Sequence, residues 1–257
     1  MKILIVGDIF SKMGRASFER NLKKLKEEHK INFVIVNGEN TSHGKGLNEG
    51  HYKWYMEQGV NVITLGNHSF HNRSIYNIID NVNNLIRPLN YNTEYGKGYC
   101  TINYNGIKIT VMQVIGRTFM NEEFSSPFVA AQEVLDNVPS DIYICDIHAE
   151  TTSEKIAFGY HFDGKIQVIY GTHTHVQTTD ARILPNGSAY ITDVGMTGAL
   201  EGVIGVKKEV ILDRLLNDGH KVFEPLDEGL SQFSAILVEI NEITHKVTKI
   251  DTLYVVE

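Results

Sequence analysis

Short apolar runs and amphipathic stretches alternate over the first 65 residues of the chain. Ile3–Val6, Phe33–Val36 and Val62–Leu65 are dominated by aliphatic side chains and carry no charge. Runs of this kind are typical of strands that are buried on both faces of a sheet. We therefore expect three neighbouring central strands.

The segments between these runs have the pattern of helices. In Ala16–His29, the apolar residues Phe18, Leu22 and Leu25 fall on one helical face, and charged residues occupy most of the remainder. A second helical stretch is expected at Glu49–Gln58, just before the third apolar run. The opening part of the chain therefore predicts a β-α-β-α-β unit with parallel strands.

The pattern changes after a short predicted helix at Ser74–Asn81. An Asn105-Gly106 turn between two apolar, strand-like stretches is a strong hairpin signal. Further strands are expected at Ile142–Cys145, Ile166–Tyr170, Arg182–Leu184, Ala189–Ile191, Phe233–Ile240 and Val247–Val256. The strands in this second half of the chain are expected to be largely antiparallel. The sequence thus predicts one α/β domain over residues 1–257, with two packed sheets and helices outside.

Composition and charge exclude several classes of protein. Hydrophobic residues make up 42% and charged residues 21% of the 257 positions, which argues against disordered and collagen-like chains. A net charge of -7 argues against a broad nucleic-acid surface or an anionic membrane partner, but is compatible with a small anionic substrate. Cys100 and Cys145 lie in apolar stretches and favour buried free thiols. The apolar run after Met1 is too short for a signal peptide or membrane span, so we expect a soluble, cytoplasmic protein.

Polar residues that can bind metals recur at the carboxyl ends of the predicted strands. Open α/β sheets form their ligand sites at this edge, so these side chains are expected to converge. The candidates are Asp8, then Glu39 and Asn40, then Asn67 and His68, then His148, and finally His173 and His175. The set contains two carboxylates, two carboxamides and four imidazoles, which is the composition of a metal site.

Each candidate also has a simpler structural explanation. Asp8 and Asn67 both follow a glycine and are ordinary turn residues. A single histidine beside an apolar strand, such as His148, is more often a hydrogen-bonded core residue than a ligand. His173 and His175 are more informative, because residues two apart in extended backbone point to the same side. The combined pattern favours a metal site over the separate structural explanations.

The ligand types narrow the choice of metal. Without cysteine ligands a structural zinc site is disfavoured, whereas carboxylate, amide and imidazole groups suit iron, manganese or catalytic zinc. The number of groups fits two divalent or trivalent ions, and Glu39 could bridge ions roughly 3.5–4 Å apart. Of the remaining histidines, which we expect to be solvated or structural, His43 and His71 lie nearest in sequence to proposed ligands.

In their order along the chain, these motifs resemble those of the calcineurin-like metallophosphoesterase superfamily. The superfamily motifs are Gly7-Asp8, Asn37-Gly38-Glu39-Asn40, Gly66-Asn67-His68, His148 and Gly171–His175. Segments that are similar to the YmdB-type bacterial phosphodiesterase branch are Val6–Asp8, Asn37–Asn40, His148–Lys155, Gly171–Gln177 and Asp193–Gly198. The resemblance implies a four-layer αββα sandwich, in which two mixed sheets are flanked by helices.

The resemblance also implies a division of the ligands between two metals. The first metal would be held by Asp8, Glu39, Asn40 and His175, and the second by Glu39, Asn67, His148 and His173. The superfamily usually has Asp-x-His in its first motif and Asp in its second, whereas this chain has Asp8-Ile9-Phe10 and Glu39. The first metal would therefore lack the histidine ligand of the Asp-x-His motif, which Asn40 could replace. The segment Ala199–Gly202 also departs from the branch, so no substrate-binding residue is assigned.

The resemblance implies hydrolysis of a 2',3'-cyclic nucleotide or an RNA-derived end, opened at the 2' oxygen to leave a 3'-phosphate. A metal-bridging hydroxide would attack phosphorus, and His68 would protonate the leaving oxygen as general acid. In an alternative role, His68 only orients the bound phosphate.

Two other functions stay open. One is a phosphatase acting on phosphomonoesters or phosphoproteins with the same metal core, and the other is a regulatory metal- or nucleotide-binding module with little turnover. The resemblance is compatible with a homo-oligomer.

Overall fold

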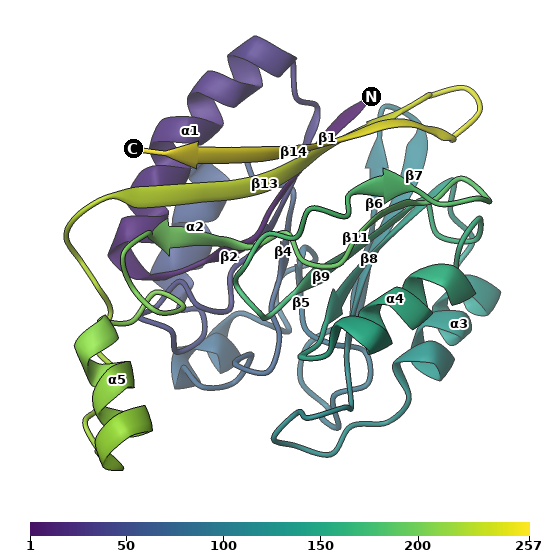
Figure 1. Ribbon diagram of the computed structural model, residues 1–257. Helices are drawn as coiled ribbons and strands as arrows, with labels where there is room; N and C mark the ends of the chain where they lie inside the picture. The colour runs from purple at the N-terminus through teal and green to yellow at the C-terminus, as the bar shows by residue number, and fades with distance from the viewer.

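Two β-sheets packed face to face form the centre of the molecule in the computed structural model, which describes residues 1–257 (Figure 1). The eight-stranded sheet has the order β2 (Asp8–Ile9), β12 (Met196–Ala199), β13 (Ser231–Ile240), β1 (Lys2–Val6), β3 (Phe33–Asn37), β4 (Val62–Thr64) and β5 (Leu85–Ile86), and β14 (Val247–Val256) also pairs with β13. The six-stranded sheet has the order β10 (Arg182–Ile183), β11 (Ala189–Ile191), β9 (Val168–Thr172), β8 (Ile142–His148), β7 (Ile107–Ile115) and β6 (Tyr99–Tyr104).

The continuous apolar runs exist because both faces of the central strands are covered. In β1, Ile3 and Ile5 belong to the hydrophobic cluster between the two sheets. Leu4 and Val6 point the other way and join Phe18 of the first helix. Since successive side chains of a strand alternate between faces, a strand between two apolar layers has no position for a polar residue.

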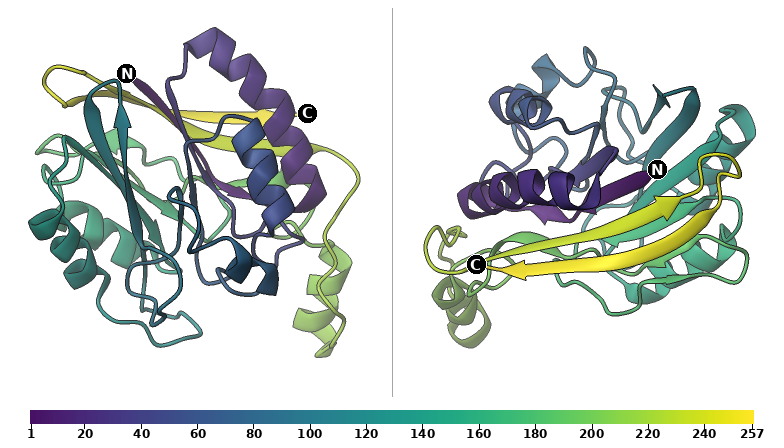
Figure 2. Two further views of the ribbon diagram at one scale, coloured as in Figure 1. Left: turned by 180° about the vertical axis from the view of Figure 1, so that it is seen from behind. Right: turned by 90° about the horizontal axis from the view of Figure 1, so that it is seen from above.

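Helices cover the outer face of each sheet. The first sheet is covered by α1 (Ser11–His29) and α2 (Glu49–Glu57), and the second by α3 (Pro127–Asn137) and α4 (Thr152–His161) (Figure 2). The last helix, α5 (Lys208–Asn217), lies at one end of the sandwich (Figure 1). The four-layer αββα arrangement with two mixed sheets is thus confirmed. None of the helices is both long and apolar enough to span a membrane.

Most predicted elements are present, and the differences have physical causes. The β1, β3 and β4 strands are parallel neighbours, and β6 and β7 form the expected hairpin. The expectation of a largely antiparallel second half is confirmed only in part. Antiparallel pairs join β6 to β7, β10 to β11, and β13 to both β12 and β14, whereas β7, β8, β9 and β11 pair in parallel. Parallel pairing needs crossover connections, and α3 and α4 provide two of them. The helix predicted at Ser74–Asn81 is only a short 3₁₀ helix over Arg73–Asn77.

A buried ion pair connects α4 to the loop that follows β11. Lys155 Nζ lies 2.7 Å from Asp193 Oδ2, and both side chains are fully buried. The same carboxylate accepts hydrogen bonds from the backbone N–H and the hydroxyl of Thr174, at 3.2 and 2.7 Å. The pair therefore fixes the segment that follows β9.

We predict that Lys155→Met destabilises the fold by about 3–5 kcal/mol, because it leaves the Asp193 carboxylate buried without a cation. Chemical denaturation gives the free energy of unfolding. The matched control is Lys53→Met, which removes the cation of the exposed pair with Glu49 and is expected to cost less than about 1 kcal/mol. Equal losses in the two variants would contradict the prediction. Lys155→Met combined with Asp193→Asn should recover part of the loss, because no buried charge remains.

Candidate active site

The strand ends of both sheets bring together all eight residues that the sequence singled out. Asp8 begins β2, Glu39 and Asn40 follow β3, Asn67 and His68 follow β4, His148 ends β8, and His173 and His175 follow β9. The residues therefore come from two sheets, and they meet where the carboxyl ends of parallel strands face one another.

The first group of contacts surrounds His148. Its Nε2 atom lies 2.8 Å from Asn67 Oδ1, 3.1 Å from His173 Nδ1 and 3.3 Å from Glu39 Oε1. Ligand atoms of Glu39, His148 and His173 all lie within 4.8 Å of one another. This is a His/Glu cluster of a kind that binds metals.

The second group surrounds Asp8 and is connected to the first by Glu39. Asn40 Nδ2 lies 3.2 Å from Asp8 Oδ1 and 3.2 Å from His175 Nε2. His175 Nε2 lies 3.6 Å from Asp8 Oδ1. Since Asn40 Nδ2 is also 3.3 Å from Glu39 Oε1, this single carboxylate oxygen contacts both groups.

Hydrogen bonds behind the imidazoles determine which nitrogen faces the cluster. His148 Nδ1 contacts Thr172 Oγ1 at 2.8 Å, and that hydroxyl donates to buried Asp146 at 2.7 Å. His175 Nδ1 lies 3.2 Å from the carbonyl oxygen of Ile204. In both residues Nε2 is left to face the cluster. Supporting contacts of this kind orient metal-ligating histidines, so the arrangement fits a metal centre.

The backbone at His173 and His175 is left-handed, with φ of 94° and 65°. The expectation that these two residues lie in extended backbone and therefore point to the same side is wrong, although both side chains reach the cluster. Positive φ is uncommon in residues other than glycine, and such strain persists where the surroundings enforce it. Here the hydrogen bonds from Thr174 to Asp193 hold the intervening residue.

The cluster also depends on a glycine next to Asn67. A Cβ atom at Gly66 would overlap Glu39 Oε2 and lie 2.5 Å from His148 Nε2. Only a residue without a side chain allows the β4 end to approach the carboxylate and imidazole this closely. The first residue of the Gly-Asn-His motif is therefore a glycine for steric reasons.

Electrostatic pairing offsets the burial of these groups. Burial by itself would raise the pKa values of Asp8 and Glu39, but His175 beside Asp8 and His148 beside Glu39 hold both below their usual range. Burial by itself would lower the pKa of His148, and Glu39 reverses this and raises it to about 9. Burial and the charge of His148 lower the pKa of His173 to about 3. The two carboxylates are therefore kept ionised although both are almost fully buried.

His68 lies at the opening of the cluster. Its backbone N–H donates to Glu39 Oε2 at 2.9 Å, its Nδ1 lies 3.1 Å from Asn40 Oδ1, and its side chain is 28% exposed. Burial lowers its pKa, and the Glu39 charge opposes this. The ring faces a cavity of about 350 Å³ whose lining residues are Asn67, His68, His71, Phe119, Met120, Asn121, Glu122, Phe124, Glu150 and His173.

Some residues of the site were not identified from the sequence. Glu150 Oε2 lies 3.1 Å from His173 Nε2, and it could have been considered because it follows His148 by two positions. Asp146 is fully buried, and burial raises its pKa to about 7; nothing in the local pattern distinguishes it from other strand residues. Of the two histidines nearest to the proposed ligands in sequence, His71 lies beside His68 with 4.6 Å between ring centroids, whereas His43 contacts Ser11 instead.

Comparison with known proteins agrees with this geometry. The family model for YmdB-like protein matches residues 4–253. A Bacillus subtilis (strain 168) protein named 2',3'-cyclic-nucleotide 2'-phosphodiesterase is 40% identical over 258 residues, covering 99% of this chain and 97% of that protein. The crystal structure of a novel phosphatase from Mycoplasma pneumoniae matches with a TM-score of 0.95 and 38% identity, covering 100% of this chain and 93% of that one. A hypothetical protein from Thermus thermophilus matches with a TM-score of 0.94 and 34% identity, covering 100% of both chains. The chain therefore belongs to the YmdB-like family of metallophosphoesterases.

Proposed function

We propose that the protein is a dinuclear metal-dependent phosphodiesterase that hydrolyses 2',3'-cyclic nucleotides or RNA ends of the same chemistry to 3'-phosphates. The observation that carries the proposal is the position of the Glu39 carboxylate. One of its oxygens contacts both the Asp8 group and the His148 group. A carboxylate between two sets of ligands is the arrangement that bridges a pair of metal ions.

The residues fit two ions. Asp8, Asn40 and His175 would hold the first, and Asn67, His148 and His173 the second, with Glu39 shared. Oxygen and nitrogen ligands of this mixture suit iron, manganese or catalytic zinc. When bound, the ions would neutralise phosphate charge and make water a nucleophile near neutral pH.

His68 is the proposed proton donor to the leaving 2' oxygen. When the bond from phosphorus to that oxygen breaks, the alkoxide must receive a proton. His68 Nδ1 lies 3.1 Å from one end of the Asn40 amide. Asn40 would ligate a metal through its oxygen, so its NH2 group would donate to Nδ1. The proton of a neutral His68 ring would then be on Nε2, the nitrogen left to face a phosphate in the cavity. The hydrogen bond from the backbone of His68 to Glu39 fixes the ring beside the proposed ligands.

We propose a diester rather than a monoester as the substrate because of the names given to the relatives. The Bacillus subtilis relative is named as a phosphodiesterase, whereas the Mycoplasma pneumoniae structure is described as a phosphatase. The ligand set is compatible with both reactions. The first assay of the purified, manganese-reconstituted protein should therefore compare 2',3'-cyclic AMP with 3'-AMP. Faster release of phosphate from 3'-AMP than opening of the cyclic diester would overturn the diesterase assignment.

We predict that His68→Ala lowers kcat for 2',3'-cyclic AMP about 10²- to 10⁴-fold, the contribution expected of a general acid. Metal content, measured by elemental analysis, should stay at the wild-type value because His68 is not a proposed ligand. His220→Ala, at an exposed position beyond α5, serves as the control and should keep wild-type kcat. Undiminished turnover by metal-loaded His68→Ala would exclude the proton-donor role.

A second prediction concerns the proposed ligands. Asn67→Ala removes the amide oxygen that lies 2.8 Å from His148 Nε2, and we expect about half of the bound metal to be lost after dialysis, together with most of the activity. Elemental analysis and a titration of activity with added manganese measure both effects. Retention of the full metal content at all metal concentrations would show that Asn67 is not a ligand.

A further inference from the structure

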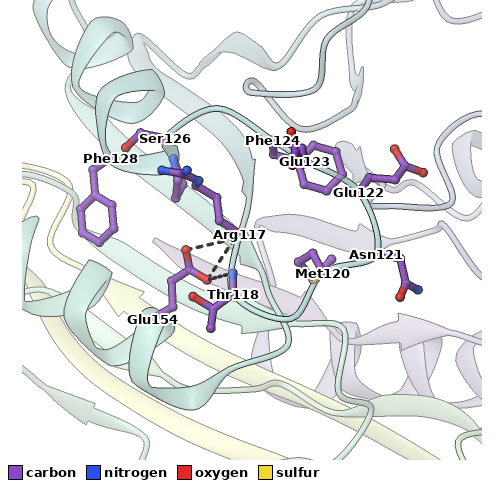
Figure 3. Close-up of a pocket in the computed structure, with 11 residues that line it drawn as sticks. Arg117, Thr118, Met120, Asn121, Glu122, Glu123, Phe124, Ser126, Phe128 and Glu154 are labelled. Carbon is purple, nitrogen blue, oxygen red and sulfur yellow. Dashed lines mark hydrogen bonds between the residues drawn. The ribbon is translucent and has the colours of Figure 1, made fainter.

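We propose that Phe119 is the platform on which the base of the nucleotide substrate stacks. This inference rests on the proposed function and adds to it the residue that recognises the nucleoside. Phe119 lines the cavity of about 350 Å³ that also contains His68 and His173. It does not line the neighbouring cavity of about 620 Å³, which shares other residues of the same loop (Figure 3).

Phe119 is the one phenyl ring of the active-site cavity with a free face. It is 85% exposed, more than any other phenylalanine, tyrosine or tryptophan of the protein. The other phenylalanine that lines the cavity, Phe124, is only 8% exposed and packs against Tyr91 with ring centroids 5.3 Å apart. The ring of Phe124 is therefore packed into the protein interior, whereas the ring of Phe119 is free to contact a ligand.

The loop that carries Phe119 is anchored on both sides of it. The Glu154 carboxylate accepts hydrogen bonds from the backbone N–H groups of Arg117 at 3.0 Å and Thr118 at 3.1 Å (Figure 3). After Phe119, the amide of Asn90 donates to the carbonyl oxygen of Ser125 at 2.8 Å. These contacts hold the loop in place, so the backbone that carries the exposed ring has a fixed position.

The backbone of Phe119 adds a second observation. Its φ is 60°, a left-handed conformation that is rare for a bulky residue. Strained residues of this kind concentrate at sites where a side chain is held for a ligand. The strain and the exposure both favour a function over a role in packing.

The chemistry of the substrate keeps the base close to the reacting phosphate. In a 2',3'-cyclic nucleotide the phosphate bridges two adjacent ribose oxygens, and the base is attached to the next carbon. With its phosphate beside His68, the substrate therefore has its base within or next to the cavity that Phe119 also lines. Every base has an aromatic face, so stacking on Phe119 would give affinity with little base preference.

The test compares two substrates in the manganese-reconstituted protein. One is 2',3'-cyclic AMP, and the other is the 2,3-cyclic phosphate of methyl ribofuranoside, which has no base. We expect Phe119→Ala to lower the preference for cyclic AMP over the base-free compound, measured as the ratio of kcat/KM values, roughly 5- to 140-fold. Most of the effect should be in KM. Phe119→Trp should keep the preference, and Phe119→Leu, which is apolar but not aromatic, should lose it.

The control is Ile243→Ala, which removes a 90% exposed apolar side chain at the distant turn between β13 and β14. It should leave both substrates unaffected. An unchanged preference in Phe119→Ala would overturn the stacking role while the diesterase function stands. Equal losses on both substrates would overturn it as well, because they would indicate a disturbed loop. If the wild type hydrolyses neither substrate, the proposed function fails, and the stacking role fails with it.

Discussion

The burial of the Glu39 carboxylate where the two sheets meet is the constraint on which the rest of the site depends. The side chain is 1% exposed, and an isolated carboxylate in such a place would cost several kcal/mol. It is tolerated because the second sheet contributes His148 at 3.3 Å and the backbone of His68 donates a hydrogen bond. The site therefore exists only where the two sheets pack together.

A second layer of buried polar groups keeps the imidazoles in position. Asp146 and Thr172 support His148 from behind, and the pair of Lys155 and Asp193 holds the segment after β9. These groups come from β8, β9, α4 and the loop after β11. The second sheet and its crossover helix therefore determine the orientation of the histidines, while the first sheet supplies most of the oxygen ligands.

Much of this arrangement could be predicted from local patterns. The uninterrupted apolar runs indicated strands buried on both faces, and the polar residues directly after them indicated one crevice. The parallel pairing of the second sheet was missed because α3 and α4 were not identified as crossovers. The left-handed backbone of His173 and His175 was also missed, since it is enforced by Asp193, which lies 18 residues beyond His175 and binds Thr174 between the two histidines.

The sequence by itself determined which residues meet, because the end of a parallel strand has a fixed location in a sheet. It also determined the kinds of ligand available, and hence the family of reactions. The tertiary structure decided which atoms face one another: the shared oxygen of Glu39, the nitrogens left free by Thr172 and Ile204, and the exposed ring of Phe119. These depend on contacts between distant segments, and no local pattern of residues encodes such distances.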